Sequence, residues 1–153
     1  MGKGESSGQA TNLTDPVLAL AVYWLRADVM HTLVHDTEDA WLEDAAKHKT
    51  EFETYIAFWL SALFVVVEGF NELKLDATQV PELSDPRVDT LRLFRNGCFH
   101  YQSNYQKFVP LLSGDLESFN WAERLHMQFG AYFASTPRSN RVGRIVPGRF
   151  KSV

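Results

Sequence analysis

Apolar residues recur at steps of three and four along most of this 153-residue chain, which is the spacing of one face of an α-helix. The first run follows Thr14, Asp15 and Pro16, which predict a helix start with a capping hydroxyl, an acid in the first turn and a proline whose missing N–H costs nothing there. It predicts a helix that ends at about His35. Its apolar face consists of Val17, Leu20, Ala21, Trp24, Leu25 and Val29.

A second and longer run begins at Trp41 and ends at about Leu73, again with steps of three and four. It predicts one very long helix and leaves room for a bend near Lys49 and Thr50. The positions that define it are Trp41, Ala45, His48, Phe52, Tyr55, Trp59, Ala62, Val66, Phe70 and Leu73. The segment 76–86, which contains two prolines, is expected to be a loop.

Two more helices are predicted farther along, from about Asp85 to Lys107 and from about Asp115 to Phe133. The core stripe of the first is Val88, Leu91, Phe94, Cys98, Tyr101 and Tyr105, and that of the second is Leu116, Phe119, Leu125, Phe129 and Tyr132. No alternating strand pattern competes, and short connections favour antiparallel neighbours. The sequence therefore predicts an all-α, up-and-down bundle of four main helices.

Length and composition favour one small domain. Hydrophobic residues make up 45% of the chain, and its 11 Phe and 4 Trp can supply a core. The expected organisation is a disordered leader over 1–13, a helical domain over 14–137 and a basic tail over 138–153. The single cysteine, Cys98, excludes a disulfide within the chain and a Cys-rich zinc site. The longest apolar stretch, Tyr55 to Val67, is too short to span a bilayer, so a cytoplasmic protein is expected.

The charge of the chain is unevenly distributed. Its net value of −4 alone argues against a nucleic-acid-binding protein. However, the tail carries basic residues and no acid: Arg138, Arg141, Arg144, Arg149 and Lys151. Ten basic against nineteen acidic residues remain in 1–137, which gives that part a net charge of −9. A basic tail is suited to bind an RNA backbone through counterion release, although a solvated tail, or one that docks on an acidic partner subunit, explains it equally well.

The segment 91–101 carries the most chemistry. On a helix, Asn96 and His100 share one face, and the long side chain of Arg95 reaches the same spot. Arginine presents a fork of donors that fits a phosphate, and histidine exchanges protons near neutrality because its ordinary pKa is about 6.5. These residues are therefore candidates for work on an RNA phosphodiester. The same residues also occur on ordinary bundle helices, where they cap a neighbour or face water.

The stretch Arg95-Asn96-Gly97-Cys98-Phe99-His100 resembles the R-x4-6-H motif of the HEPN superfamily. The layout upstream is also similar: an apolar helix ending near 65–70, a polar loop, and Asp85-Pro86 opening the motif helix. The resemblance covers roughly residues 14–135, and only the motif itself is specific. It implies a small helical bundle, often a metal-independent ribonuclease of bacterial toxin–antitoxin or phage-defence systems. Other members are catalytically silent modules that bind RNA or nucleotides.

The resemblance implies a role for each motif residue. His100 would act as general base or acid, Arg95 would neutralise the phosphorane oxygens, and Asn96 would bind phosphate or orient His100. Glu68, as a partner of Arg95, and Tyr101 would support the site, although Glu68 is equally well explained as a surface acid. A homodimer would bring two motifs together, with RNA as substrate, a cognate antitoxin as a further partner, and neither cofactor nor metal. The alternative is a non-catalytic RNA-, nucleotide- or protein-binding module.

Two other patterns look like fragments of metal sites. His31 and His35 have the i, i+4 spacing of a metal pair, but no third ligand accompanies them in the sequence, so they are expected to face solvent. Glu123 and His126 form a Glu-x-x-His, but the di-iron bundles that use this motif need a second copy and two further glutamates. The sequence therefore predicts no metal site.

Overall fold

The computed structural model describes residues 15–104 and 115–136, and within these ranges it consists of helices joined by short connections, without a strand. The four α-helices are α1 (Pro16–Glu43), α2 (Ala45–Glu72), α3 (Arg87–Phe99) and α4 (Leu116–Ser135). Two short 3-10 helices, η1 (Ala77–Gln79) and η2 (Pro81–Ser84), lie between α2 and α3. The predicted all-α bundle is confirmed. The predicted leader and basic tail lie outside the described residues.

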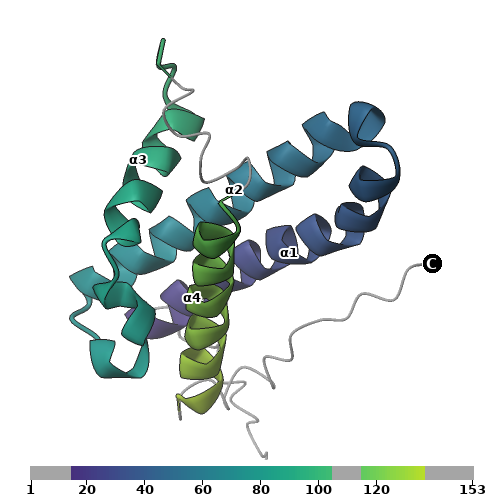
Figure 1. Cartoon of the computed structure of the whole chain (residues 1–153). Coiled ribbons are helices and arrows are strands. Elements are labelled where there is room, and N and C mark those ends of the chain that lie inside the picture. Colours follow the sequence, from purple (N-terminus) through teal and green to yellow (C-terminus); the bar gives the residue numbers. More distant parts are fainter. Residues whose placement is uncertain (1–14, 105–114, 137–153) are drawn as a thin grey trace, which may run out of the picture.

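Helices α1 and α2 form a long antiparallel hairpin that is the base of the bundle (Figure 1). Asp44 makes the turn alone: its N–H donates to the carbonyl of Ala40 (3.0 Å), and its carboxylate accepts from the N–H of Lys47 (3.2 Å). Across the turn, the rings of Trp41 and Phe52 stack at 4.9 Å.

This turn corrects two predicted boundaries. Helix α1 does not end at His35, and Trp41 belongs to α1 rather than to the following helix. The apolar spacing continues through both helices, and the turn between them occupies a single residue. Periodicity alone therefore shows no break at Asp44, although an aspartate is a good N-cap. At the other end of α1 the predicted start is correct, but the capping residue is Asp15 rather than Thr14: its carboxylate accepts from Val17 N–H (3.0 Å), and no acid lies in the first turn.

Helix α3 packs against α2 and is much shorter than predicted, because it ends at Phe99 rather than near Lys107. The next residue, His100, has an extended backbone (φ −126°, ψ 129°). The residues after Phe99 include His, Tyr, Ser and Asn, which are weak helix formers. Of the predicted stripe, Leu91 and Phe94 are buried, whereas Tyr101 is 97% exposed and is not a core residue.

Helix α4 runs across the α1–α2 pair and closes the core (Figure 1). Its apolar face meets large aromatic rings of the hairpin, for example Phe129 against Phe70 at 5.4 Å. A Cβ atom on Gly130 would lie 2.8 Å from the ring of Trp24, so the absence of a side chain there permits close contact with α1. The segment 76–86 is not a simple loop: Val80 is completely buried, and Glu82 accepts a hydrogen bond from the indole of Trp121 (3.4 Å).

By length and composition alone, α1 and α2 could each cross a membrane. The core helices of soluble proteins satisfy the same criterion, and part of each helix is buried within the bundle. The expectation that the chain lacks a stretch long enough for a bilayer therefore does not hold for the helices as they form. Helix α2 extends on both sides of Tyr55–Val67, the stretch on which that expectation was based, and α1 is a separate candidate outside it.

Candidate functional site

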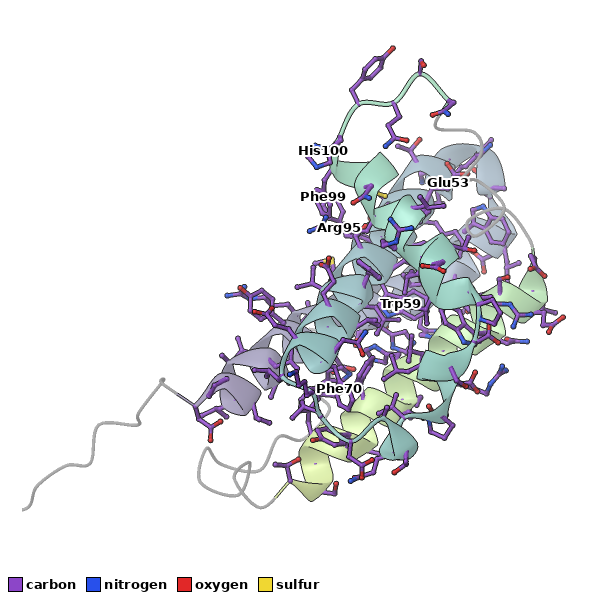
Figure 2. All side chains as sticks on the ribbon, turned by 90° about the vertical axis from the view of Figure 1, so that its left-hand side faces the viewer. Glu53, Trp59, Phe70, Arg95, Phe99 and His100 are labelled. Atoms are coloured by element: carbon purple, nitrogen blue, oxygen red, sulfur yellow. The ribbon has the colours of Figure 1, made fainter. Side chains whose placement is uncertain are left out.

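The predicted motif lies at the C-terminal end of α3, where Arg95, Phe99 and His100 gather (Figure 2). The guanidinium of Arg95 donates from Nη1 to the amide oxygen of Asn96 (3.1 Å), and its Nη2 lies 3.7 Å from a carboxylate oxygen of Glu68 on α2. Both charged side chains are partly exposed, at 31% and 47%. The expected ion pair between Arg95 and Glu68 is therefore present, in a long and solvent-accessible form. The Nε of Arg95 is buried and has no hydrogen-bond partner within the described ranges.

His100 is placed differently from the prediction. It is the C-cap of α3 rather than a helical residue, so it does not share a helix face with Asn96. The two are instead linked through the backbone, since the N–H of His100 donates to the carbonyl of Asn96 (3.0 Å). The imidazole is exposed and forms no hydrogen bond or ion pair with the residues that the structure describes. Tyr101 points into solvent nearby.

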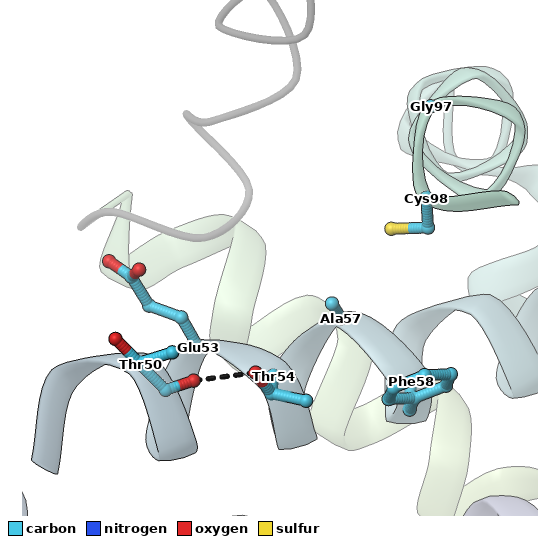
Figure 3. A pocket seen from close by; sticks show the side chains of 7 residues that line it. All are labelled: Thr50, Glu53, Thr54, Ala57, Phe58, Gly97 and Cys98. Carbon is cyan, nitrogen blue, oxygen red and sulfur yellow. Dashed lines mark hydrogen bonds between the residues drawn. The ribbon is translucent and has the colours of Figure 1, made fainter. Parts of the chain in front are cut away.

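A shallow groove with a volume of about 310 Å³ separates α2 from the last turn of α3 (Figure 3). Its lining consists of Thr50, Glu53, Thr54, Ala57, Phe58, Gly97 and Cys98. The hydroxyl of Thr54 is already used, because it donates to the carbonyl of Thr50 (2.6 Å). The single charged residue of this lining is Glu53, whose carboxylate would repel a phosphate. The groove is therefore unsuited to the RNA backbone.

A second cluster of polar side chains lies between α1 and α4. His31 Nε2 is 2.9 Å and 2.7 Å from the two carboxylate oxygens of Glu123. His35 Nε2 is 3.2 Å from Oε1 of the same carboxylate and 3.2 Å from His31 Nε2. Burial increases inwards, since the exposed fraction of the side chain falls from 44% for His35 to 22% for Glu123 and 13% for His31.

His126 closes the inner side of this cluster and is 1% exposed. Its Nδ1 lies 3.3 Å from the indole Nε1 of Trp59, and its Nε2 lies 3.0 Å from a carboxylate oxygen of Asp28. An indole N–H can only donate, so Nδ1 of His126 accepts and the ring hydrogen sits on Nε2, which donates to Asp28. Both ring nitrogens are thereby used. The ring also stacks on His31 at 4.3 Å and on Trp24 at 5.5 Å.

The environment changes the acidity of two of these groups. Burial lowers the pKa of His126 below its ordinary value, although its hydrogen bond to Asp28 acts in the opposite direction. This agrees with a neutral imidazole in the tautomer given by its hydrogen bonds. Burial alone would raise the pKa of Glu123, but the hydrogen bond from His31 and the charges of His31 and His35 outweigh it, so that pKa lies below its usual value. Glu123 is therefore a carboxylate at neutral pH.

The cluster corrects the interpretation of His31 and His35 as solvent-facing residues without a third ligand. The third group, Glu123, comes from α4, 88 positions beyond His35. Each half of the cluster carries a recognisable spacing, i, i+4 on α1 and Glu-x-x-His on α4, but each half is incomplete by itself. The presence of both fragments in one chain is the sequence signal for this site. Among the residues that the structure describes, two groups of side chains are close enough to hold a metal ion: His31, His35 and Glu123, and Asp28, His31 and His126.

The five basic residues predicted to bind RNA, Arg138, Arg141, Arg144, Arg149 and Lys151, lie outside the described residues. No protein-family model, curated protein or solved structure matches this chain.

Proposed function

We propose that this protein is a metal-independent endoribonuclease of HEPN type that acts in the cytoplasm as a bacterial toxin or phage-defence effector. The observation that carries the proposal is the surface arrangement at the end of α3. A partly exposed arginine, oriented by Asn96 and Glu68, lies in the same short stretch as an exposed histidine. Arg95 supplies a permanent charge for a phosphate, and His100 supplies a group that can move a proton.

In the proposed reaction the 2′-OH of the RNA attacks the adjacent phosphorus, and the 5′-oxygen of the next nucleotide leaves. The imidazole of His100 takes the hydroxyl proton or protonates the leaving oxygen. Arg95 stabilises the charge that builds on the non-bridging oxygens, and this electrostatic contribution is commonly the largest in such reactions. The 3.7 Å contact with Glu68 is long, so an incoming phosphate can compete for Nη2. The products carry a 2′,3′-cyclic phosphate and a 5′-hydroxyl.

One histidine is too few for both proton transfers, and a homodimer would supply the second. Apolar side chains beside the motif support such an interface: Phe58 on α2 and Phe99 on α3 are each about half exposed and contact one another edge to face at 6.1 Å. Leu93, on the same helix, is 43% exposed. A two-fold interface here would face each motif with its own copy. Light scattering at micromolar concentration should give twice the 17.4 kDa of the chain, and a monomer would contradict the composite site.

The test is cleavage of mixed cellular RNA by the purified chain in EDTA. Wild type should cleave and leave 2′,3′-cyclic phosphate ends, whereas His100→Ala and Arg95→Lys should not, because an ammonium keeps the charge of Arg95 but loses its planar fork. Arg92→Lys is the matched control, since Arg92 lies one turn earlier on α3, is half exposed and pairs with Asp89 at 3.5 Å. Full activity in His100→Ala, or activity that requires added divalent metal, would contradict the proposal.

The second candidate is a non-catalytic module that binds RNA, a nucleotide or a partner such as an antitoxin. It is favoured by the lack of any hydrogen bond or ion pair between the imidazole of His100 and the described residues. A module of this kind would bind RNA through Arg95 without cutting it. Binding that is lost in Arg95→Ala, combined with an absence of cleavage products from wild type, would select this candidate.

A further inference from the structure

The half-buried cluster between α1 and α4 has the composition of a transition-metal site. Two imidazoles and one carboxylate, from His31, His35 and Glu123, are the protein ligands of one class of catalytic zinc site, in which the fourth position is left open. Imidazole nitrogen favours zinc and its neighbours in the first transition row over magnesium or calcium, which prefer oxygen. We propose that these three residues bind a zinc ion that connects α1 to α4.

The geometry supports this assignment. His31 Nε2, His35 Nε2 and Glu123 Oε1 form a nearly equilateral triangle with sides of 2.9, 3.2 and 3.2 Å. Two ligands of a tetrahedral zinc at about 2.0–2.1 Å lie about 3.3–3.4 Å apart. The three donor atoms would therefore separate by only a few tenths of an ångström to accept the ion. Each residue therefore offers one ligand atom close enough to the other two to share a single ion.

The surroundings hold the ligands in place. The ring of His31 lies against Trp59 at 4.8 Å and stacks on His126 at 4.3 Å, which restricts its rotation. The outer nitrogen of His35, Nδ1, lies 3.4 Å from the carboxylate of Glu38. A carboxylate at this position favours the tautomer that leaves Nε2 free to bind a metal, as in many zinc sites.

The other triad that could hold an ion is less suitable. Asp28, His31 and His126 also place ligand atoms within 4.8 Å of one another. However, both ring nitrogens of His126 are already hydrogen-bonded, to Trp59 and Asp28, and metal binding would break one of these buried bonds. His126 is therefore assigned to the supporting shell. The open fourth position lies towards solvent on the side of His35, the most exposed of the three ligands, where water can complete the tetrahedron.

The experiment uses the full chain without an affinity tag, stripped with EDTA and desalted. Zn²⁺ titrated by calorimetry should bind at one equivalent per chain, and Mg²⁺ in tenfold excess should not compete. Co²⁺ should give the visible absorption of a four-coordinate site. His35→Ala and Glu123→Gln should each weaken Zn²⁺ binding at least tenfold. Zn²⁺ should raise the Tm of wild type, because it binds only the folded chain, and should not raise the Tm of His35→Ala.

The matched control is His48→Ala. His48 Nδ1 lies 3.6 Å from Glu51 Oε2, an i, i+3 pair like that of His35 and Glu38, but on α2 and away from the cluster. The His48→Ala variant should bind Zn²⁺ with the affinity of wild type. Binding of less than half an equivalent by wild type, a loss below tenfold in both cluster variants, or an equal loss in His48→Ala would each overturn the assignment. These measurements read binding, not cleavage, so their outcome is independent of the proposed ribonuclease.

Discussion

The end of α3 and the contact between α1 and α4 both contain histidines, but the two regions are built in opposite ways. At the end of α3 the motif residues lie within six positions of one another and are partly exposed, and Arg95 makes one side-chain hydrogen bond to Asn96 and one long ion pair to Glu68 on α2. Between α1 and α4 the residues come from distant segments and form a continuous network of short contacts around buried His126.

The difference shows that a recognisable motif and a well-organised site are separate properties. The α3 stretch has a sequence signature, yet within one chain its histidine has no polar side-chain partner among the described residues. The α1–α4 cluster has only fragments of a signature, yet burial and hydrogen bonds fix its rings. A loosely held surface group is suited to meet a second subunit or a substrate, whereas a buried network is suited to hold helices or an ion.

The largest expected effect is on the proposed ribonuclease activity at the end of α3. His100→Ala should reduce RNA cleavage by about a hundred- to ten-thousand-fold, the range for loss of a positioned proton-transfer group. Its free energy of unfolding should change by less than about 0.5 kcal/mol, because the imidazole is exposed and makes no side-chain hydrogen bond or ion pair within the described part of the chain. Single-turnover cleavage assays and urea unfolding measure the two quantities. A large loss of stability would show that His100 supports the fold.

His126→Ala should do the reverse and destabilise the fold by about 3 kcal/mol. The change leaves a cavity and removes the partners of the Trp59 indole and the Asp28 carboxylate. Urea unfolding monitored by tryptophan fluorescence gives the free energy. If the free energy of unfolding of His126→Ala equals or exceeds that of His100→Ala, the two regions do not differ as described.

Removal of residues 138–153 should weaken RNA binding and make it less sensitive to salt. The deleted segment carries five basic residues and no acid, and each phosphate contact with single-stranded RNA contributes about 0.7 to the slope of log K against log salt concentration. The slope should fall by up to about 3.5. Fluorescence anisotropy with a labelled RNA from 50 to 300 mM KCl measures it. An unchanged slope would assign all phosphate contacts to residues 1–137.

The smallest effect is expected from Asp115→Ala at the start of α4. Asp115 caps the helix by accepting from the hydroxyl of Ser118 and from the N–H of Glu117 (3.3 Å), and these bonds lower the pKa of its carboxyl. Because the pKa of Asp115 is lower in the folded than in the unfolded chain, the ionised carboxylate stabilises the fold fully at pH values above the ordinary carboxyl pKa. This stabilisation is lost as the pH falls through the pKa of the folded state. The variant should have a Tm a few degrees lower at pH 7. The difference should shrink below about pH 4, where thermal scans of both proteins should converge.

The sequence by itself determined the class of fold and most helix starts. Asp15, Pro16 and Asp115 mark helix N-termini because capping is a local interaction between a side chain and the next turn. The apolar period identified the stripes that form the core. It did not identify the turn at Asp44, which a single residue makes, or the early end of α3, because weak local preferences permit either continuation or termination.

The tertiary structure alone decided where the histidines lie. Whether His31 faces solvent or Glu123 depends on α4 crossing α1, a contact between residues 92 positions apart that Gly130 helps to permit. No local rule specifies such a crossing, because it follows from how whole apolar faces pack together. Asn96 and His100 would share one face of a continuous helix, but α3 ends at Phe99, so they do not. Sequence fixes which groups are available, and packing determines which of them meet.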